Sequence, residues 1–200
     1  MEIKRIAVFC GSSSGDMPVY EEKAYELGRF LARNGIGLVY GGGKVGLMGA
    51  VANGALSVGG EVIGVIPEFM IPKELAHEGV TELIVTRDMH QRKAKMHELC
   101  DGVITLPGGF GTFEELFEVL TWGQLALHSK PIGFLNVDGY YNTLLKFLDE
   151  TIEKRFVKPE SRCSYVVSES QKELLSLMAG SLSLPENEKS FITTDSPKSL

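Results

Sequence analysis

The segment GVITLPGGFGTFEEL (residues 102–116) contains three kinds of local sequence in succession. Its first part, GVITLP, is a short, continuous apolar run, which is typical of a strand buried on both faces of a parallel sheet. Gly108, Gly109 and Gly111 follow, and a helical pattern of apolar residues begins at Thr112. A strand, a glycine-rich turn and a helix in this order form the repeating unit of α/β proteins.

The same alternation of strands and helices runs through the rest of the chain. Apolar runs predict strands at residues 3–10, 37–41, 62–67, 82–86, 102–107, 131–136 and 164–168. Helical periodicity predicts helices at residues 18–33, 46–58, 88–100, 112–127, 140–155 and 169–179. We therefore predict a Rossmann-like α/β fold, with a doubly wound, mainly parallel sheet of about seven strands and helices on both faces. Residues 1–180 form a single domain in this prediction, and residues 181–200, which lose the apolar period, form a C-terminal tail.

Composition and charge exclude several classes of function. The chain has 200 residues and a net charge of -6, whereas a nucleic-acid partner requires clustered Lys and Arg. No apolar run approaches the roughly 20 residues of a membrane span. The N-terminal MEIKRIAVFCG enters a strand pattern without the layout of a signal peptide, and the three cysteines are scattered. We therefore expect a reduced, cytoplasmic protein that binds neither nucleic acid nor membranes.

Glycine-rich loops follow three of the predicted strands, namely GSSSG (11–15), GGGKVGLMG (41–49) and PGGFGT (107–112). In a doubly wound sheet, ligands bind at the carboxyl ends of the strands, where such loops gather, and glycine lets a ligand approach the backbone closely. The middle loop matches G-x-G-x-x-G, but it follows the second strand rather than the first. It is open to three interpretations: a tight turn packed on its helix, a backbone wall around a mononucleotide, or a dinucleotide site.

Two local signals coincide at the start of the helix after the PGG turn. Thr112 occupies the expected N-cap position and Glu115 stands three residues later, which is the pattern of a capping box. A capping box does not require the preceding glycines, whose amides, together with the positive end of the helix, suit a phosphate. We therefore predict phosphate binding here. Glu115 is either a capping residue only, or an ionised carboxylate that holds sugar hydroxyls and stabilises a cationic transition state.

The segment DMHQRKAKMHELC (88–100) carries the densest positive charge near a predicted strand end. Its basic residues either form a solvated face or hold an anion. Met89, Arg92 and Met96 share one helical face, which places an arginine beside apolar side chains. There the guanidinium can bind a phosphate or carboxylate through two hydrogen bonds. The two histidines of this segment have no partners at metal-ligand spacing, so we expect no metal site.

Five segments together resemble one known family. PGGFGTFEE (107–115) resembles the PGGxGTxxE signature of the Lonely Guy (LOG) family of cytokinin-activating phosphoribohydrolases, and DMHQRKAKM (88–96) resembles its paired MHxRK segment. CGSSSG, GGGKVGLMG and LNVDGYYNTLL are also similar to that family and occur in the same order. The resemblance covers roughly residues 3–157. Such sequences are often labelled lysine decarboxylases, although no lysine here stands in a context typical of pyridoxal phosphate binding.

The resemblance implies hydrolysis of the N-glycosidic bond of adenosine 5′-monophosphate, plain or N6-substituted, to ribose 5-phosphate and adenine or a cytokinin base. It implies Arg92 and Glu115 as catalytic residues. The implied substrate contacts are Glu74, Lys93, Gly109, Phe110, Gly111, Thr112, Phe113, Glu114 and Thr121, with Gly108 as a further candidate. The resemblance also implies a homodimer in which neighbouring subunits complete each site, and it implies neither a metal nor an organic cofactor.

The residues leave three alternative functions open: a binding or carrier protein, a dinucleotide-dependent oxidoreductase, and a structural or assembly role. The same fold can hold a nucleotide or a phosphorylated cofactor in a non-catalytic binding or carrier protein. Incubation with adenosine 5′-monophosphate separates such a binding protein from the hydrolase, because only the hydrolase releases the free base.

Overall fold

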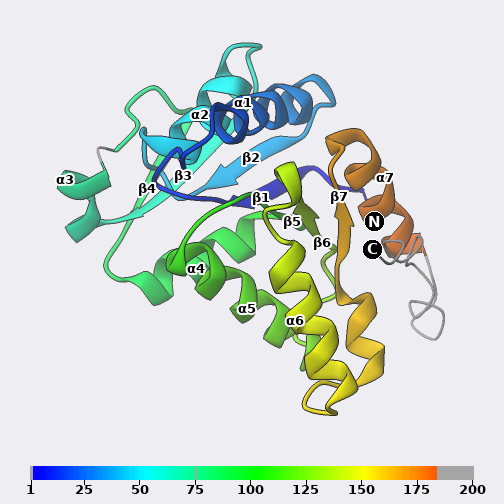
Figure 1. Ribbon diagram of the computed structural model, residues 1–200. Helices are drawn as coiled ribbons and strands as arrows, with labels where there is room; N and C mark the ends of the chain where they lie inside the picture. Colours follow the sequence, from blue (N-terminus) through cyan, green and yellow to red (C-terminus); the bar gives the residue numbers. More distant parts are fainter. Residues whose placement is uncertain (1, 75, 184–200) are drawn as a thin grey trace.

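The computed structural model describes residues 2–74 and 76–183 (Figure 1). Within these residues, seven strands form one parallel sheet in the order β4-β3-β2-β1-β5-β6-β7. The strands are β1 (Arg5–Phe9), β2 (Gly37–Tyr40), β3 (Val62–Pro67), β4 (Glu82–Thr86), β5 (Gly102–Thr105), β6 (Ile132–Leu135) and β7 (Val166–Ser168). Each lies within a predicted strand range, so the predicted doubly wound parallel sheet is confirmed.

All six predicted helices are present, together with short helical segments that the sequence did not indicate. The helices are α1 (Pro18–Arg33), α2 (Gly46–Leu56), α3 (Ile71–Glu74), α4 (Met89–Leu99), α5 (Phe110–Gln124), α6 (Asn142–Glu153) and α7 (Gln171–Ser183). Short 3-10 helices occur at η1 (Glu68–Met70), η2 (Val137–Gly139) and η3 (Pro159–Ser164). These short segments and α3 are too brief to show a helical period in the sequence.

Local signals account for two of the helix starts. α1 begins at Pro18, whose fixed φ suits the first helical position. α4 begins after Asp88, whose side chain accepts a hydrogen bond from the N–H of Gln91 at 2.8 Å. This cap fixes where α4 starts, and therefore the register of the residues that α4 presents to the sheet.

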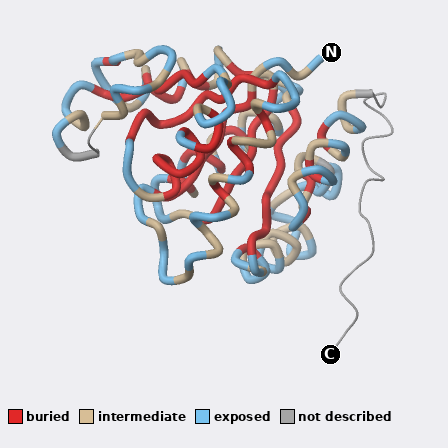
Figure 2. Tube along the Cα trace, turned by 90° about the horizontal axis from the view of Figure 1, so that it is seen from above, coloured by how far each residue is buried: buried red, intermediate tan, exposed pale blue. Residues whose placement is uncertain are grey.

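The helices cover the two faces of the sheet in two groups. α1, α2 and α7 pack on one face, and α4, α5 and α6 pack on the other (Figure 1). Along β1, Ile6 and Val8 face the first group while Ala7 and Phe9 face the second, as the alternation of a strand requires. Buried residues follow the strands through the centre of the molecule (Figure 2). Because both faces of the central strands are covered, their sequences are continuous apolar runs rather than alternating ones.

Glycines let α1 and α2 pack very closely. A Cβ atom at Gly28 of α1 would lie 2.0 Å from the carbonyl oxygen of Val51, and one at Gly54 of α2 would lie 2.0 Å from the carbonyl oxygen of Tyr25. Most residues of α2 are buried, as its small apolar sequence predicts. The two helices therefore form a rigid layer on this face of the sheet.

The winding of the chain reverses between β1 and β5. β2, β3 and β4 lie on one side of β1, and β5, β6 and β7 lie on the other, so the loops after β1 and β5 lead to opposite layers. Near the strand ends these loops stay joined, because the N–H of Gly11 donates to the carbonyl of Pro107 at 3.0 Å. The start of α2 is attached to the same place, since the N–H of Met48 donates to the carbonyl of Gly11 at 3.3 Å. Doubly wound proteins bind ligands at such a switch point.

The start of α5 differs from the prediction. α5 begins at Phe110, and Gly109 is its N-cap residue, with φ of -99° and ψ of -153°. Thr112 therefore lies inside the first turn and is buried, and the predicted capping box of Thr112 and Glu115 is wrong. The pattern placed the start too late because Phe110 and Gly111 add nothing to the apolar period, while the backbone of Gly109 can still begin a helix.

The C-terminal part is only partly described. α7 continues to Ser183, so residues 181–183 of the predicted tail are helical, and residues 184–200 lie outside the described residues. The single-domain prediction for residues 1–180 stays a prediction. Across the part of the chain that the structure describes, no helix is long and apolar enough to cross a membrane.

Candidate active site

A cavity of about 190 Å³ opens at the carboxyl ends of β1 and β2, beside the start of α5. Both predicted catalytic residues line it, and so do four of the predicted substrate contacts. The lining residues are Val8, Cys10, Gly11, Ser12, Gly41, Met48, Arg92, Gly109, Phe110, Gly111, Thr112 and Glu115. The switch point of the sheet is therefore also the place where the chemically informative residues meet.

The start of α5 supplies amide donors to this cavity. No side chain caps the helix, and the first helical bond to the N-cap residue runs from the N–H of Phe113 to the carbonyl of Gly109 at 3.0 Å. The N–H groups of the preceding turn, at Phe110, Gly111 and Thr112, have no acceptor within the helix by its geometry. Together with the positive end of the helix dipole, they form an anion-binding site.

The glycines in and after the PGG turn differ in the space that surrounds them. A Cβ atom at Gly108 would lie 2.1 Å from Oγ1 of Thr112 and 2.9 Å from the backbone nitrogen of Gly11, so the loops leave no room there. Cβ atoms at Gly109 and Gly111 would meet nothing within 4 Å. Gly108 thus serves close packing between the loops, and Gly109 and Gly111 leave the helix start open to a ligand.

Arg92 of α4 is buried, with 5% of its surface exposed, and is held by the ends of two strands. Its Nε donates to the carbonyl of Val65 at 3.0 Å, and its Nη2 donates to the carbonyl of Gly41 at 3.1 Å. A Cβ atom at Gly41 would lie 2.1 Å from that Nη2, so glycine is required for the arginine to reach its position. The interpretation of Arg92 as part of a solvated basic face is therefore wrong.

Glu115 approaches the same guanidinium from α5. Nη1 of Arg92 lies 3.5 Å from Oε1 of Glu115, and the glutamate has 8% of its surface exposed. An ion pair this well buried is shielded from water, so its charges act more strongly on a ligand than surface charges would. Because Arg92 is anchored by two carbonyls, it fixes the position of the Glu115 carboxylate in the cavity.

The ammonium group of Lys93 binds two carboxylates of α5. It donates to Glu114 and, at 3.0 Å, to Glu118, which ties α4 to α5. Burial alone would lower the pKa of Lys93, but the hydrogen bonds with the two carboxylates outweigh burial and raise the pKa. Neither Lys93 nor Glu114 lines the cavity, although the resemblance implies that both contact substrate.

Gly108, Phe113 and Thr121 also lie outside this cavity. Phe113 packs in the core, with its ring centroid 6.4 Å from that of Tyr141. Thr121 is exposed, and its hydroxyl donates to the carbonyl of Phe117 at 2.7 Å. Glu74 is the last residue of α3, and its side chain lies outside the described atoms. Of the predicted residues whose side chains are described, the fold of a single chain thus brings only part to the cavity.

Two contributors were not singled out from the sequence. Met48 lines the cavity from α2 but reads as an ordinary core residue in a small apolar helix. Tyr140 donates its hydroxyl to the carbonyl of Gly108 at 2.6 Å, across 32 residues of sequence. No local pattern indicates that contact. By contrast, the CGSSSG loop, which supplies Cys10, Gly11 and Ser12, was marked by its glycines at the end of the first strand.

The G-x-G-x-x-G loop is explained largely by packing. Gly46 has φ of +60°, and a Cβ atom there would lie 2.4 Å from the backbone of Ser12. At Gly49, a Cβ atom would lie 2.0 Å from the carbonyl oxygen of Lys44. These contacts support the tight-turn interpretation, while Gly41 at the start of the loop also lines the cavity.

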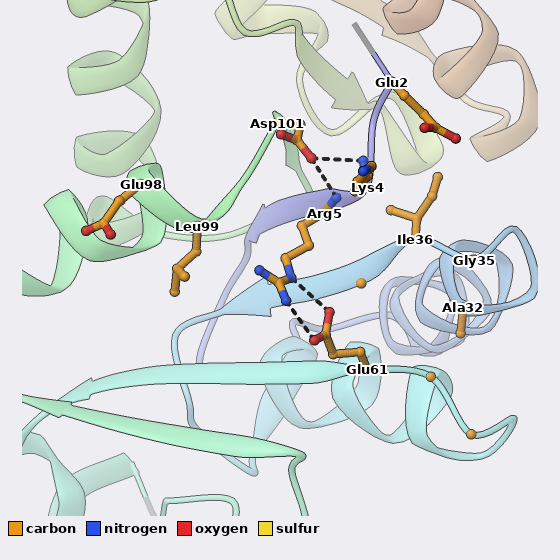
Figure 3. Close-up of a pocket in the computed structure, with 13 residues that line it drawn as sticks. Glu2, Lys4, Arg5, Ala32, Gly35, Ile36, Glu61, Glu98, Leu99 and Asp101 are labelled. Carbon is orange, nitrogen blue, oxygen red and sulfur yellow. Dashed lines mark hydrogen bonds and ion pairs between the residues drawn. The ribbon is translucent and has the colours of Figure 1, made fainter.

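A larger cavity, of about 840 Å³, lies at the opposite edge of the sheet, where the strands begin (Figure 3). Three of its charged side chains, Arg5, Glu61 and Asp101, are held by hydrogen bonds within its wall. Arg5 donates to both carboxylate oxygens of Glu61 at 2.8 Å, which lowers the pKa of Glu61, and Asp101 accepts from the N–H groups of Lys4 and Arg5 at 2.8 and 2.9 Å. These pairs stabilise the amino ends of the strands. In residues 2–74 and 76–183, no three His, Cys, Asp or Glu side chains are grouped as metal ligands would be.

Comparison with known proteins identifies relatives along most of the chain. Residues 48–178 match the family described as "Possible lysine decarboxylase". The cytokinin riboside 5′-monophosphate phosphoribohydrolase LOG1 of Arabidopsis thaliana is 51% identical over 174 residues, which cover 87% of this chain and 82% of that protein. The probable cytokinin riboside 5′-monophosphate phosphoribohydrolase LOGL6 of Oryza sativa subsp. japonica is 52% identical over 172 residues, 86% of this chain and 69% of that protein.

Solved structures share the architecture at lower identity. The molybdenum cofactor binding protein of Rippkaea orientalis superimposes with a TM-score of 0.68 at 25% identity, over 92% of this chain and 99% of that one. The molybdenum cofactor carrier protein of Chlamydomonas reinhardtii superimposes with a TM-score of 0.67 at 21% identity, over 92% of this chain and 100% of that one. The second similarity shows the fold alone.

Proposed function

Because this chain belongs to the Lonely Guy (LOG) family of cytokinin riboside 5′-monophosphate phosphoribohydrolases, we propose that it hydrolyses the N-glycosidic bond of adenosine 5′-monophosphates, plain or N6-substituted. The products are ribose 5-phosphate and either adenine or a cytokinin base. About half of the residues are identical to those of the curated enzymes along most of the chain, which supports this substrate class.

One observation carries the proposal: the Arg92–Glu115 pair lines the same cavity as the uncapped start of α5. A 5′-phosphate accepts hydrogen bonds from amides among those of Gly109, Phe110, Gly111 and Thr112, which all line the cavity. Glu115 follows Thr112 by three residues, about 4.5 Å along the helix axis and on the same face. We therefore expect the carboxylate to face the pentose of a substrate whose phosphate is bound there.

The reaction breaks the bond between C1′ of the ribose and the nitrogen of the base. The bonding electron pair leaves with the base, so the ribose acquires oxocarbenium character in the transition state. Glu115 stabilises that positive charge and orients a water molecule, whose oxygen bonds to C1′ and whose proton ends on the departing base. Arg92 holds Glu115 and stabilises the electron-rich base by hydrogen bonding, since a guanidinium does not release its proton.

The lysine decarboxylase name does not fit Lys93, the residue that follows Arg92 in the chain. A Schiff-base lysine needs a neutral amine at working pH. The ammonium of Lys93 is paired with Glu114 and Glu118, and these bonds raise its pKa despite burial. Lys93 is therefore an interhelical anchor and not a nucleophile.

A carrier protein is the second candidate function. The structural similarity to the molybdenum cofactor binding protein of Rippkaea orientalis favours it, since the two proteins share the fold over most of the chain. The sequence identity to phosphoribohydrolases is about twice as high, which favours the enzyme. Binding of a phosphorylated compound without release of a free base would support the carrier.

We also propose that the enzyme works as a homodimer through one face of α5. Phe110, Phe117 and Leu125 are 92%, 39% and 63% exposed, and their spacing places them along a single face of the helix or just beyond its end. We name these three residues the α5 stripe. Exposed apolar residues in a row are typical of protein interfaces. Thr121 lies between Phe117 and Leu125, so it can contact substrate only across such an interface.

The test is base release from a panel of nucleoside 5′-monophosphates, with and without an N6-isopentenyl group, followed by chromatography. We expect free base from adenosine monophosphates in the parent chain. Glu115→Gln should lower kcat about 100-fold or more, because the amide cannot offset the charge on the ribose.

Glu118→Gln is the matched control. Glu118 lies on the same helix, is paired with Lys93, and does not line the cavity, so this variant should retain the parental rate. Parental activity in Glu115→Gln would remove the catalytic assignment.

A further inference from the structure

We infer that Tyr140 is a positioning residue that aims the Gly109 amide at the phosphate of the substrate; the inference rests on the proposed function. The hydroxyl of Tyr140 donates to the carbonyl of Gly108 at 2.6 Å. Tyr140 lies after β6, at the junction of η2 and α6, whereas Gly108 lies in the turn after β5. The contact thus joins two neighbouring loops at the carboxyl edge of the sheet.

Because the peptide group is planar, the hydrogen bond from Tyr140 to the Gly108 carbonyl also sets the direction of the Gly109 N–H group. The carbonyl of Gly108 and the N–H of Gly109 belong to one planar unit, and the described chain contains no cis peptide bond. In a trans peptide these two groups point in opposite directions. The N–H of Gly109 therefore points away from Tyr140. Gly109 lines the cavity, whereas Tyr140 lies outside the set of residues that line it.

The turn at Gly108 and Gly109 is flexible enough to need a restraint on the peptide between them. Glycine has no Cβ atom, so successive glycines leave the peptide between them free to rotate. The preceding peptide is already fixed, because the carbonyl of Pro107 accepts the N–H of Gly11 at 3.0 Å. The following residues are fixed by α5. The Gly108–Gly109 peptide lies between these two fixed parts, and its carbonyl is held by the hydroxyl of Tyr140.

Tyr140 is partly exposed, with 39% of its surface accessible, and two other tyrosine rings contact its ring. Its ring meets Tyr20 and Tyr141 edge-on, at centroid distances of 5.9 and 5.0 Å. Tyr20 in turn packs against Gly15, where a Cβ atom would lie 2.8 Å from the ring. The tyrosine therefore connects the loops after β1, β5 and β6, and its hydroxyl is placed by packing rather than by chance.

The adjacent Tyr141 provides a matched control. Its hydroxyl donates to the carbonyl of Leu106 at 2.6 Å, a contact of the same kind and length in the same loop. The residue after Leu106 is Pro107, which has no N–H, so this hydrogen bond directs no donor. Removal of either hydroxyl is the same chemical change, but only the hydroxyl of Tyr140 orients a peptide that carries an N–H group.

The experiment compares Tyr140→Phe, Tyr141→Phe and the parent chain by ³¹P NMR titration with inorganic phosphate and by steady-state kinetics with adenosine 5′-monophosphate. Tyr140→Phe should weaken phosphate binding and raise KM about 5- to 10-fold, with kcat changed less than about twofold, because one neutral hydrogen bond is lost. Tyr141→Phe should lower the unfolding midpoint without changing phosphate affinity or KM.

Phosphate affinity and KM of Tyr140→Phe within twofold of the parent, or an equal loss in Tyr141→Phe, would overturn the inference. Failure of the proposed function is a different result. A parent chain that binds phosphate but releases no base contradicts the hydrolase, while the phosphate titration still tests Tyr140. A parent chain that releases base but does not bind phosphate overturns the inference alone, and one that does neither overturns both.

Discussion

Gly108 and Gly109 are neighbours in one turn, yet a side chain at each position would meet different surroundings. At Gly108 a methyl group would collide with the hydroxyl of Thr112 and with the backbone of Gly11. At Gly109 it would enter open space, and the φ of -99° is accessible to any residue. The two glycines therefore have separate roles, one in packing and one in keeping the helix start open.

Gly108→Ala should destabilise the fold by about 1–3 kcal/mol, because the two loops must move apart to admit the methyl group. Gly109→Ala should change the free energy of unfolding by no more than about 0.5 kcal/mol. Urea unfolding followed by circular dichroism measures both. Equal stability of the two variants would show that the loops yield at Gly108.

For Arg92, the local sequence pattern predicted the surroundings of the side chain but not its hydrogen-bond partners. Its spacing from Met89 and Met96 predicted a position beside apolar side chains, and the arginine is indeed buried. The pattern could not name its partners. The carbonyls of Gly41 and Val65 are 51 and 27 residues away in sequence, and only the sheet brings them to one side chain.

At the scale of elements, α4 and α5 meet through a group of rings as well as through Lys93. The ring of His97 on α4 lies edge-on to the ring of Trp122 on α5, and their centroids are 5.2 Å apart. The centroid of the His97 ring is also 4.8 Å from that of the His128 ring. Among the described residues, Nε2 of His97 is buried without a hydrogen-bond partner. Burial, followed by the charges of Lys130 and His128, lowers the pKa of His97 to about 4.

This shift makes the stability of the α4–α5 contact depend on pH. In the unfolded chain the imidazole takes up a proton near pH 6.5, its ordinary value, whereas in the folded chain it does so only near pH 4. Between these values the unfolded state binds more protons, so stability is complete above pH 6.5, falls as the pH falls, and levels off below pH 4.

His97→Phe should remove part of this loss, since the phenyl ring keeps the edge contact with Trp122 and cannot be protonated. Between pH 7 and pH 5 the parent should lose on the order of 1 kcal/mol more than the variant, after allowance for partial solvent exposure. Urea unfolding at the two pH values gives the comparison. His90→Phe, at an exposed position of the same helix, should follow the parent. The same pH dependence in His97→Phe as in the parent would exclude His97 as the cause.

At the scale of the whole molecule, the described cavity contains only part of the site that the resemblance implies. Thr121 lies on the outer face of α5, beside the α5 stripe. A second copy packed on this stripe would bring such residues toward a neighbouring cavity. The proposed dimer therefore accounts for both the exposed apolar residues and the missing contacts.

Phe117→Glu should convert the proposed dimer to a monomer, because burying an unpaired carboxylate in an apolar interface is strongly unfavourable. Sedimentation equilibrium measures the mass, and base release should fall together with assembly. Phe147→Glu is the control, since Phe147 is also exposed but lies on α6, on a different surface. An unchanged mass for Phe117→Glu would contradict the proposal that the α5 stripe is the interface.

The order of strands and helices, the parallel sheet and the glycine loops at its carboxyl edge could be read from the sequence, because hydrophobic period and glycine position are local signals. Helical spacing also indicated that Arg92 lies beside apolar side chains, and the catalytic roles of Arg92 and Glu115 stay a prediction from the family resemblance. The start of α5, the engagement of Lys93 with Glu114 and Glu118, and the bond from Tyr140 to Gly108 were decided only by the tertiary structure. The physical reason is that a side chain bonds to whatever the packed layers place beside it, and those partners are remote in the chain.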